Sequence, residues 1–200
     1  MIYRPLMLAL VALWIALAGC ASSPPSRFYM LTPLHGSEEE STQKANERCM
    51  LIGVGPIEVP AYLDRPQIIT RISQNELDLA EFHKWAEPLK DSLARVLVQN
   101  LSTLLCTKGV FSFPWKDATK VDYQITLDVI RFDGSVGGTV SLVAQWSIFD
   151  GEGKEMIATG KSYIKEMAEG GDFKALVAAQ SLALANLSRQ IASAIREVSQ

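Results

Sequence analysis

The sequence predicts an α/β (α+β) fold, a two-layer sandwich in which two long amphipathic helices cover one face of a largely antiparallel sheet. Apolar residues recur at three- and four-residue steps over 88–108 and again over 172–195, which is the period of an α-helix. Apolar and polar residues alternate over 121–164, as they do in strands with one buried face. Each element has a single apolar face, so these faces must be buried against one another.

Short strands are predicted for the first part of the sheet. Residues 27–31 are compact and apolar and are expected to form an edge strand, followed by an exposed polar loop over 32–48. Residues 50–59 are expected to form a strand that ends at Pro60. Residues 67–82 begin with β-branched side chains and turn at Asn75, which predicts a β-hairpin.

The first long helix is expected to begin at Glu87-Pro88, because proline is tolerated at the first helical position. Its apolar face runs from Leu89 to Leu105. Lys108-Gly109 is the expected C-terminal stop, with a short strand after it.

A three-stranded antiparallel meander should follow. Val121–Val129 alternates clearly, and the apolar parity then flips at Ile130 and Phe132, which predicts a bulge near Val129-Ile130. The last helix should begin after Asp172, a good N-cap. Small residues such as Ala179 and Ala183 line its other side; close self-association and plain helix propensity both account for them.

The N-terminus has the features of a lipoprotein signal peptide. Arg4 precedes an uncharged apolar run, Leu6–Ala18, which as a helix would span about 20 Å, less than a hydrocarbon core of about 30 Å. Leu17-Ala18-Gly19-Cys20 supplies the small residues before a cysteine that lipoprotein signal peptidase requires. We therefore expect removal of residues 1–19 and a covalent acyl lipid on Cys20, the alternative being an ordinary signal peptide. Ala21, rather than Asp, favours the outer membrane.

The mature chain is expected to consist of a lipidated tether, 20–26, and a single domain, 27–200, that contains the exposed loop. The formal net charge of the 200-residue chain is −3, and this mild acidity argues against a nucleic acid partner. Cys49 and Cys106, 57 positions apart, are a candidate disulfide that would contribute about 4 kcal/mol in the chain-entropy model. Two free thiols remain the alternative.

Few groups in the sequence point to catalysis, so the chain is predicted not to be an enzyme. There are two histidines, His35 and His83, and only His83 is a credible base. No motif of the Gly-x-Ser-x-Gly, His-Glu-x-x-His or Cys-x-x-Cys type occurs. Three glutamates at 38–40 on a polar loop do not fix a coordination geometry. We expect no metal and no cofactor other than the acyl lipid.

The segment Val59–Gln67 joins two strands and contains two prolines, which stiffen it. A stiff loop presents its side chains at low entropic cost, and Tyr and Arg are enriched at binding hot spots. Tyr62, Leu63, Asp64 and Arg65 are therefore candidate partner-binding residues. The alternative is a loop packed on its own domain, with Asp64 and Arg65 paired locally.

Residues Ile57–Arg71 resemble the signature of the PqiC family, the ABC-type transport auxiliary lipoproteins, also described as membrane integrity-associated transporter subunits. Leu79–Leu89 fits the same family, in which a strand leads through a Trp-x-Glu-Pro-like turn into a helix. This adds Trp85 and Glu87 as candidate contact positions. Arg27–Leu31 corresponds to the family's start, and Cys20 to its acylation site.

The resemblance implies a non-enzymatic, lipid-anchored subunit on the periplasmic face of the outer membrane. Such proteins are similar in role to partners of MCE-domain tunnels, which move phospholipid or other lipids between membranes. The expected partners are therefore an MCE-domain tunnel protein at its outer end, membrane lipid, and further copies of the chain in a ring. The alternative is a stand-alone periplasmic lipoprotein that carries lipid cargo itself; a periplasmic hydrolase using His83 is a third reading.

Overall fold

The computed structural model describes residues 24–35, 49–115 and 120–199, so the predictions for the signal peptide, Cys20 and most of the 32–48 loop lie outside the described residues. The described elements, in chain order, are β1 (Arg27–Tyr29), β2 (Met50–Glu58), β3 (Gln67–Arg71), β4 (Leu77–Trp85), α3 (Leu89–Leu104), β5 (Thr107–Ser112), β6 (Tyr123–Gly134), β7 (Thr139–Asp150), β8 (Met156–Met167) and α4 (Phe173–Val198). The strands form one eight-stranded sheet.

The sheet divides at β6. Along one edge β6 pairs with β7, which pairs with β8, and these long antiparallel ladders form the predicted meander. Along its other edge β6 pairs in parallel with β2, up to the pair Glu58–Asp128. The other edge of β2 pairs in parallel with β5. At the far end of β6, Gly134 pairs with Thr70 of β3, which leads through the predicted hairpin to β4 and then to β1. The sheet is therefore mixed.

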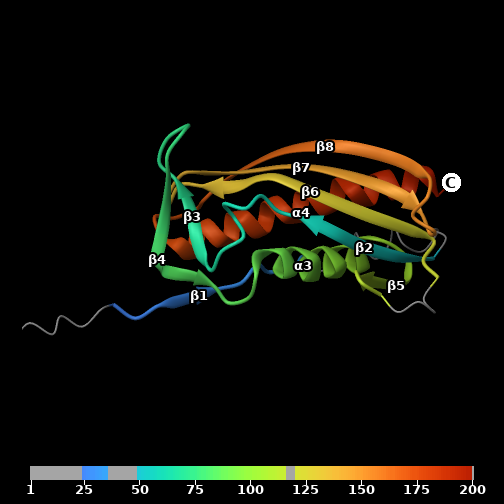
Figure 1. Ribbon diagram of the computed structural model, residues 1–200, viewed down its shortest axis with the longest axis horizontal. Coiled ribbons are helices and arrows are strands. Elements are labelled where there is room, and N and C mark those ends of the chain that lie inside the picture. Colours follow the sequence, from blue (N-terminus) through green and yellow to red (C-terminus); the bar gives the residue numbers. More distant parts are fainter. Residues whose placement is uncertain (1–23, 36–48, 116–119, 200) are drawn as a thin grey trace, which may run out of the picture.

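Both helices cover the same side of the sheet, because they pack against each other as well as against strands. Helix α4 lies along β7 and β8, and α3 lies beside it against β2 and β5 (Figure 1). Leu93 and Leu97 of α3 and Leu187 and Ile191 of α4 are fully buried in the core. The predicted two-layer sandwich is confirmed. None of the helices in the described part of the chain is long and apolar enough to cross a membrane.

Several local predictions are confirmed. The register of β6 against β7 shifts between Val129 and Arg131, and Ile130 is 43% exposed between the buried Val129 and Phe132, which is the expected bulge. The Asp172 carboxylate accepts a hydrogen bond from the Ala175 amide at 2.9 Å and so caps α4.

The alanines on the side of α4 that carries small residues pack within the domain. Ala179, Ala183 and Ala185 are buried against the rest of the chain. Internal packing therefore accounts for these alanines without a second copy.

The expected end of the first helix at Lys108-Gly109 is wrong. Helix α3 ends at Leu104, and Gly109 lies inside β5, paired with Leu51 of β2. The chain leaves the helix earlier because Leu105 turns to an extended conformation and remains buried, which commits the next residues to the β2 ladder. A disulfide joins Cys106 to Cys49 at a Cα–Cα distance of 4.6 Å, and it links the start of β2 to the segment that follows α3.

Candidate functional site

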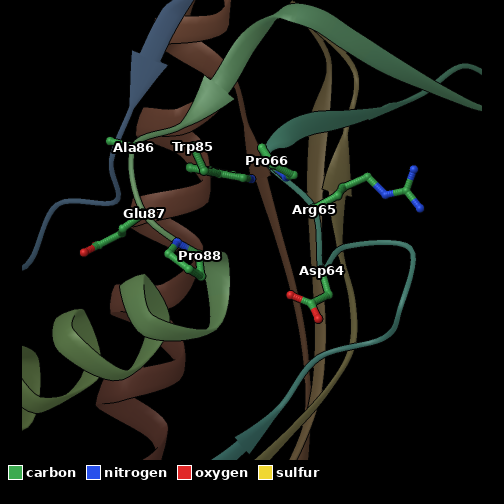
Figure 2. Close-up of a pocket in the computed structure, with 7 residues that line it drawn as sticks. All are labelled: Asp64, Arg65, Pro66, Trp85, Ala86, Glu87 and Pro88. Carbon is green, nitrogen blue, oxygen red and sulfur yellow. The ribbon is translucent and has the colours of Figure 1, made fainter.

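The two segments singled out in the sequence meet around one surface pocket. The pocket has a volume of about 290 Å³ and lies between the loop that precedes β3 and the turn that follows β4 (Figure 2). It is lined by Asp64, Arg65, Pro66, Trp85, Ala86, Glu87 and Pro88. The Trp85 amide donates to the Pro66 carbonyl at 2.7 Å and joins the two sides directly.

The loop over residues 59–66 connects β2 to β3 along the edge of β6 that faces away from β7. On this edge β2 pairs with β6 as far as Asp128, and β3 pairs with β6 only at Gly134, so no strand pairs with β6 on this edge between these two residues. It is compact, because the Leu63 amide donates to the Pro60 carbonyl at 2.8 Å and the Leu63 side chain is buried. The loop is therefore an ordered part of the domain.

The side chain of Asp133, in β6, is fully buried and contacts the loop through Tyr62. Its carboxylate accepts a hydrogen bond from the Tyr62 hydroxyl at 2.9 Å. The Arg71 guanidinium donates to both carboxylate oxygens at 2.8 Å, and Arg131 adds another hydrogen bond at 2.8 Å. We call these four residues the Asp133 cluster. Such charge-assisted bonds fix geometry tightly.

The pKa values in the cluster follow from this arrangement. Burial alone would raise the pKa of Asp133, but hydrogen bonds from Arg71, Tyr62 and Arg131 hold it below its usual value. Burial, followed by the charge of Asp133 and the hydrogen bond to it, raises the pKa of Tyr62 to about 12. Tyr62 therefore stays protonated and donates, and Asp133 stays ionised and accepts.

The turn over residues 85–88 is held differently. Glu87 accepts hydrogen bonds from Arg95 of α3, at 3.0 Å from Nε and 2.8 Å from Nη2. Arg95 also donates to the Leu31 carbonyl at 3.1 Å. The hydrogen bond from Arg95 lowers the pKa of Glu87. Because both side chains of this ion pair are about one-third exposed, water screens it.

The structure divides the six predicted contact residues. Asp64, Arg65, Trp85 and Glu87 line one pocket, whereas Tyr62 bonds to Asp133 and the Leu63 side chain is buried in the core. The carboxylate of Asp64 and the guanidinium of Arg65 point in different directions, and the guanidinium points away from the other residues of the pocket (Figure 2). The alternative read from the sequence is therefore half right: the loop packs on its own domain through Tyr62 and Leu63, but Asp64 and Arg65 are not paired with each other.

The pocket combines an apolar centre with a charged rim. Its lining includes the apolar residues Pro66, Trp85, Ala86 and Pro88, of which Trp85 is only 6% exposed, and the charged residues Asp64, Arg65 and Glu87. The described residues contain no group of three or more His, Cys, Asp or Glu side chains that could hold a metal ion. This arrangement suits contact with another macromolecule, since interfaces have an apolar core and a polar rim.

His83 lies in an aromatic cluster rather than beside a nucleophile. Its ring stacks on Phe173 of α4 with centroids 3.8 Å apart, and its Nδ1 is 2.7 Å from the Tyr29 hydroxyl. It thereby joins β1, β4 and α4.

The sequence analysis missed Arg71, Arg131 and Asp133. One signal was available: Asp133 and Arg131 follow the predicted bulge, where a strand changes the face that each side chain meets. Strand alternation places Asp133 on the face opposite Phe132, where an acid is expected to meet solvent, so its burial under the loop could not be read from the sequence.

Comparison with solved structures defines the class of fold. The chain superposes on a crystal structure of an uncharacterised protein with a TM-score of 0.68 and 21% identity, covering 86% of this chain and 99% of that one. A structure from Xanthomonas campestris gives a TM-score of 0.69 and 17% identity, covering 86% and 96% of the two chains. These likenesses show a shared mixed-sheet sandwich and no more.

Sequence comparison places the chain within that class. Residues 29–192 match the family described as the ABC-type transport auxiliary lipoprotein component, and the chain belongs to this family. It is 31% identical over 140 residues to the intermembrane transport lipoprotein PqiC of Escherichia coli (strain K12), which covers 70% of this chain and 71% of that protein. The PqiC of Shigella flexneri gives the same values. The predicted resemblance is confirmed, and these relatives are transport auxiliary lipoproteins rather than enzymes.

Proposed function

We propose that this protein is the lipid-anchored outer-membrane accessory subunit of an MCE-type intermembrane (phospho)lipid transport system. It docks on the outer end of the periplasmic tunnel and supports envelope integrity. Membership of the transport auxiliary lipoprotein family supports the transport role, and the Leu17–Cys20 pattern supports the anchor. The observation that carries the docking step is the pocket formed jointly by residues 64–66 and 85–88.

The chemistry of this pocket favours a protein partner. Trp and Arg dominate binding hot spots, and both Trp85 and Arg65 line this pocket. The pocket volume of about 290 Å³ is at the lower limit of about 300 Å³ for sites that enclose a drug-sized ligand, and a diacyl phospholipid is larger. The pocket therefore favours docking over the alternative, in which the protein carries its own lipid cargo.

The Asp133 cluster adds affinity without touching the partner. It holds the loop through one hydrogen bond, from Tyr62 to the buried Asp133 carboxylate, and three further hydrogen bonds from Arg71 and Arg131 fix that carboxylate in place. A loop that is already ordered loses little conformational entropy when a partner binds. The rigid loop thus presents Asp64 and Arg65 in a fixed position.

The lipid would restrict the domain to the membrane surface. One acyl chain gives only marginal anchoring, whereas a tri-acylated Cys20 carries three. Anchoring raises the effective concentration of the domain near the tunnel exit. Several copies arranged as a ring would shield an apolar path from periplasmic water, and no energy conversion takes place in this subunit.

The test is co-purification of an MCE-domain protein from detergent-solubilised cells, with the native mass of the complex recorded. Three forms are compared: the unmodified protein, Asp64→Ala/Arg65→Ala, and the control Glu152→Ala/Lys154→Ala. The control removes an equally exposed acid–base pair, 2.7 Å apart, from the turn between β7 and β8. We expect the unmodified protein and the control to recover the MCE protein, and the pocket variant to lose at least tenfold, about 1.4 kcal/mol.

Other outcomes contradict specific parts of the proposal. Equal recovery by all three forms would place the docking contact outside the pocket. A monomeric unmodified protein that recovers no MCE protein would overturn the assembly and favour lipid-cargo binding instead.

A further inference from the structure

We infer that the surface formed by Phe28, Met30, Phe82 and Lys84 rests directly on a phospholipid bilayer. We call this surface the tether face. The inference rests on the proposed lipid anchor at Cys20. It goes beyond that anchor, because it assigns a second, non-covalent membrane contact to side chains of the folded domain.

The tether face exposes large apolar side chains where a soluble domain would place polar ones. Phe28 is 65% exposed and Met30 is 47% exposed, whereas Leu31 is buried in the core. In β4, Phe82 is 39% exposed. A strand whose outward positions are apolar indicates a surface that is covered in the working state of the protein.

The pairing of β1 with β4 brings these side chains together. The strands are parallel, and Phe28 pairs with Lys84. Phe82 lies two residues before Lys84, and Met30 two residues after Phe28. The result is a small apolar surface bordered by one cation, Lys84, in a chain whose net charge is −3.

The length of the chain before β1 identifies the occupant. Seven residues, 20–26, separate the lipid from the strand. Fully extended, they span at most about 25 Å. Strand β1 lies at the periphery of the molecule, at the end opposite the C-terminus (Figure 1). An anchor at Cys20 therefore holds the tether face close to the bilayer, whichever other partners the domain engages.

The composition of the tether face matches the membrane interface. Apolar side chains bury about 5–10 Å into the boundary between headgroups and acyl chains, and basic side chains add attraction to anionic lipid. The Phe28 and Met30 side chains supply the first interaction, and Lys84 the second. A bilayer is thus the occupant that both the position and the chemistry indicate, rather than a second copy of the chain.

The test uses the purified lipoprotein reconstituted into vesicles of phosphatidylethanolamine and phosphatidylglycerol with brominated acyl chains, which quench tryptophan on contact. Met30→Trp places the probe on the tether face. Met156→Trp is the matched control, since Met156 is 53% exposed at the start of β8, near the other end of the molecule (Figure 1). Emission is compared with that of the unmodified protein, and flotation with the vesicles is recorded for each form.

We expect all forms to float, the emission added at position 30 to fall about twofold, and the emission added at position 156 to be unchanged. Flotation without quenching at position 30 would overturn the inference and assign the surface to a protein contact, while the anchor and the docking proposal would stand. Quenching at both positions would overturn it as well, since the contact would have no preferred face. Failure of the unmodified protein to float would remove the Cys20 anchor and this inference together, leaving the co-purification test of docking independent.

Discussion

The two sides of the pocket depend on carboxylates of very different burial. The loop over 59–66 bonds through the Tyr62 hydroxyl to the Asp133 carboxylate, which is fully buried and also pairs with Arg71 of β3 and Arg131 of β6. The turn over 85–88 is held by Glu87 and Arg95, both about one-third exposed. Removing one partner of Asp133 should lower the free energy of unfolding strongly, because a charge is then left buried without compensation. Removing one partner of the Glu87–Arg95 pair should lower it little, because water replaces the missing partner.

The largest expected effect follows removal of the buried carboxylate. Asp133→Ala should lower the free energy of unfolding by about 3 kcal/mol, because Arg71 and Arg131 then face each other without an anion. Asp128→Ala, an exposed acid on the same strand, should change it by less than about 0.5 kcal/mol. Chemical denaturation measures both. Similar values for the two variants would show that burial is not what separates the two sides of the pocket.

Low pH should destabilise the protein by protonating the Asp133 carboxylate. The folded-state pKa of Asp133 is lowered from 3.8, so its contribution is fully present above that value and is lost as the pH falls through the lowered pKa. Glu87 behaves in the same direction. Denaturation at a series of pH values below 5 should therefore show a shallower fall in stability for Asp133→Asn than for the unmodified protein. Parallel pH profiles would contradict this.

Tyr62→Phe should have an intermediate effect, a loss of about 1.5 kcal/mol, since one hydrogen bond to a charged group disappears while both arginines remain. The same change should increase backbone hydrogen exchange in residues 59–66 more than in the 85–88 turn. An equal increase on both sides would mean that the loop and the turn move as one unit.

The smallest effect is expected for the exposed pair. Glu87→Gln should reduce stability by about 0.5 kcal/mol, because Arg95 retains the Leu31 carbonyl and solvent. Raising the salt concentration should reduce the difference further, as for any exposed pair. A loss comparable with that of Asp133→Ala would reverse the comparison and make the turn the critical side.

Features set by neighbouring residues were predictable from the sequence. The meander, the bulge at Ile130 and the Asp172 cap each depend on residues close together in the chain. The early end of α3 was not predictable, because it depends on pairing of β5 with β2, more than fifty positions away. The parallel pairing of β2 with β6 was also not predictable, because it is set by tertiary packing.

The site was predictable in its parts but not in its assembly. The resemblance named both segments, yet only the pairing of β3 with β4 brings Pro66 to Trp85. Tyr62 was assigned to partner contact because tyrosine is common in hot spots. The structure adds a hydrogen bond to Asp133, 71 positions away, which no local sequence pattern predicts; contact of Tyr62 with a partner stays a prediction.

Strand β1 has a mechanical consequence for a chain anchored at Cys20. It is three residues long, it follows the tether directly, and its Tyr29 pairs with Trp85, while the Tyr29 carbonyl accepts from the Ala86 amide at 2.9 Å. A pull on the lipid therefore loads, in shear, the hydrogen bonds that flank the pocket wall. With the proposed anchor at Cys20, one short strand would link the membrane to the pocket and would set the height and the orientation of the proposed docking surface relative to the bilayer.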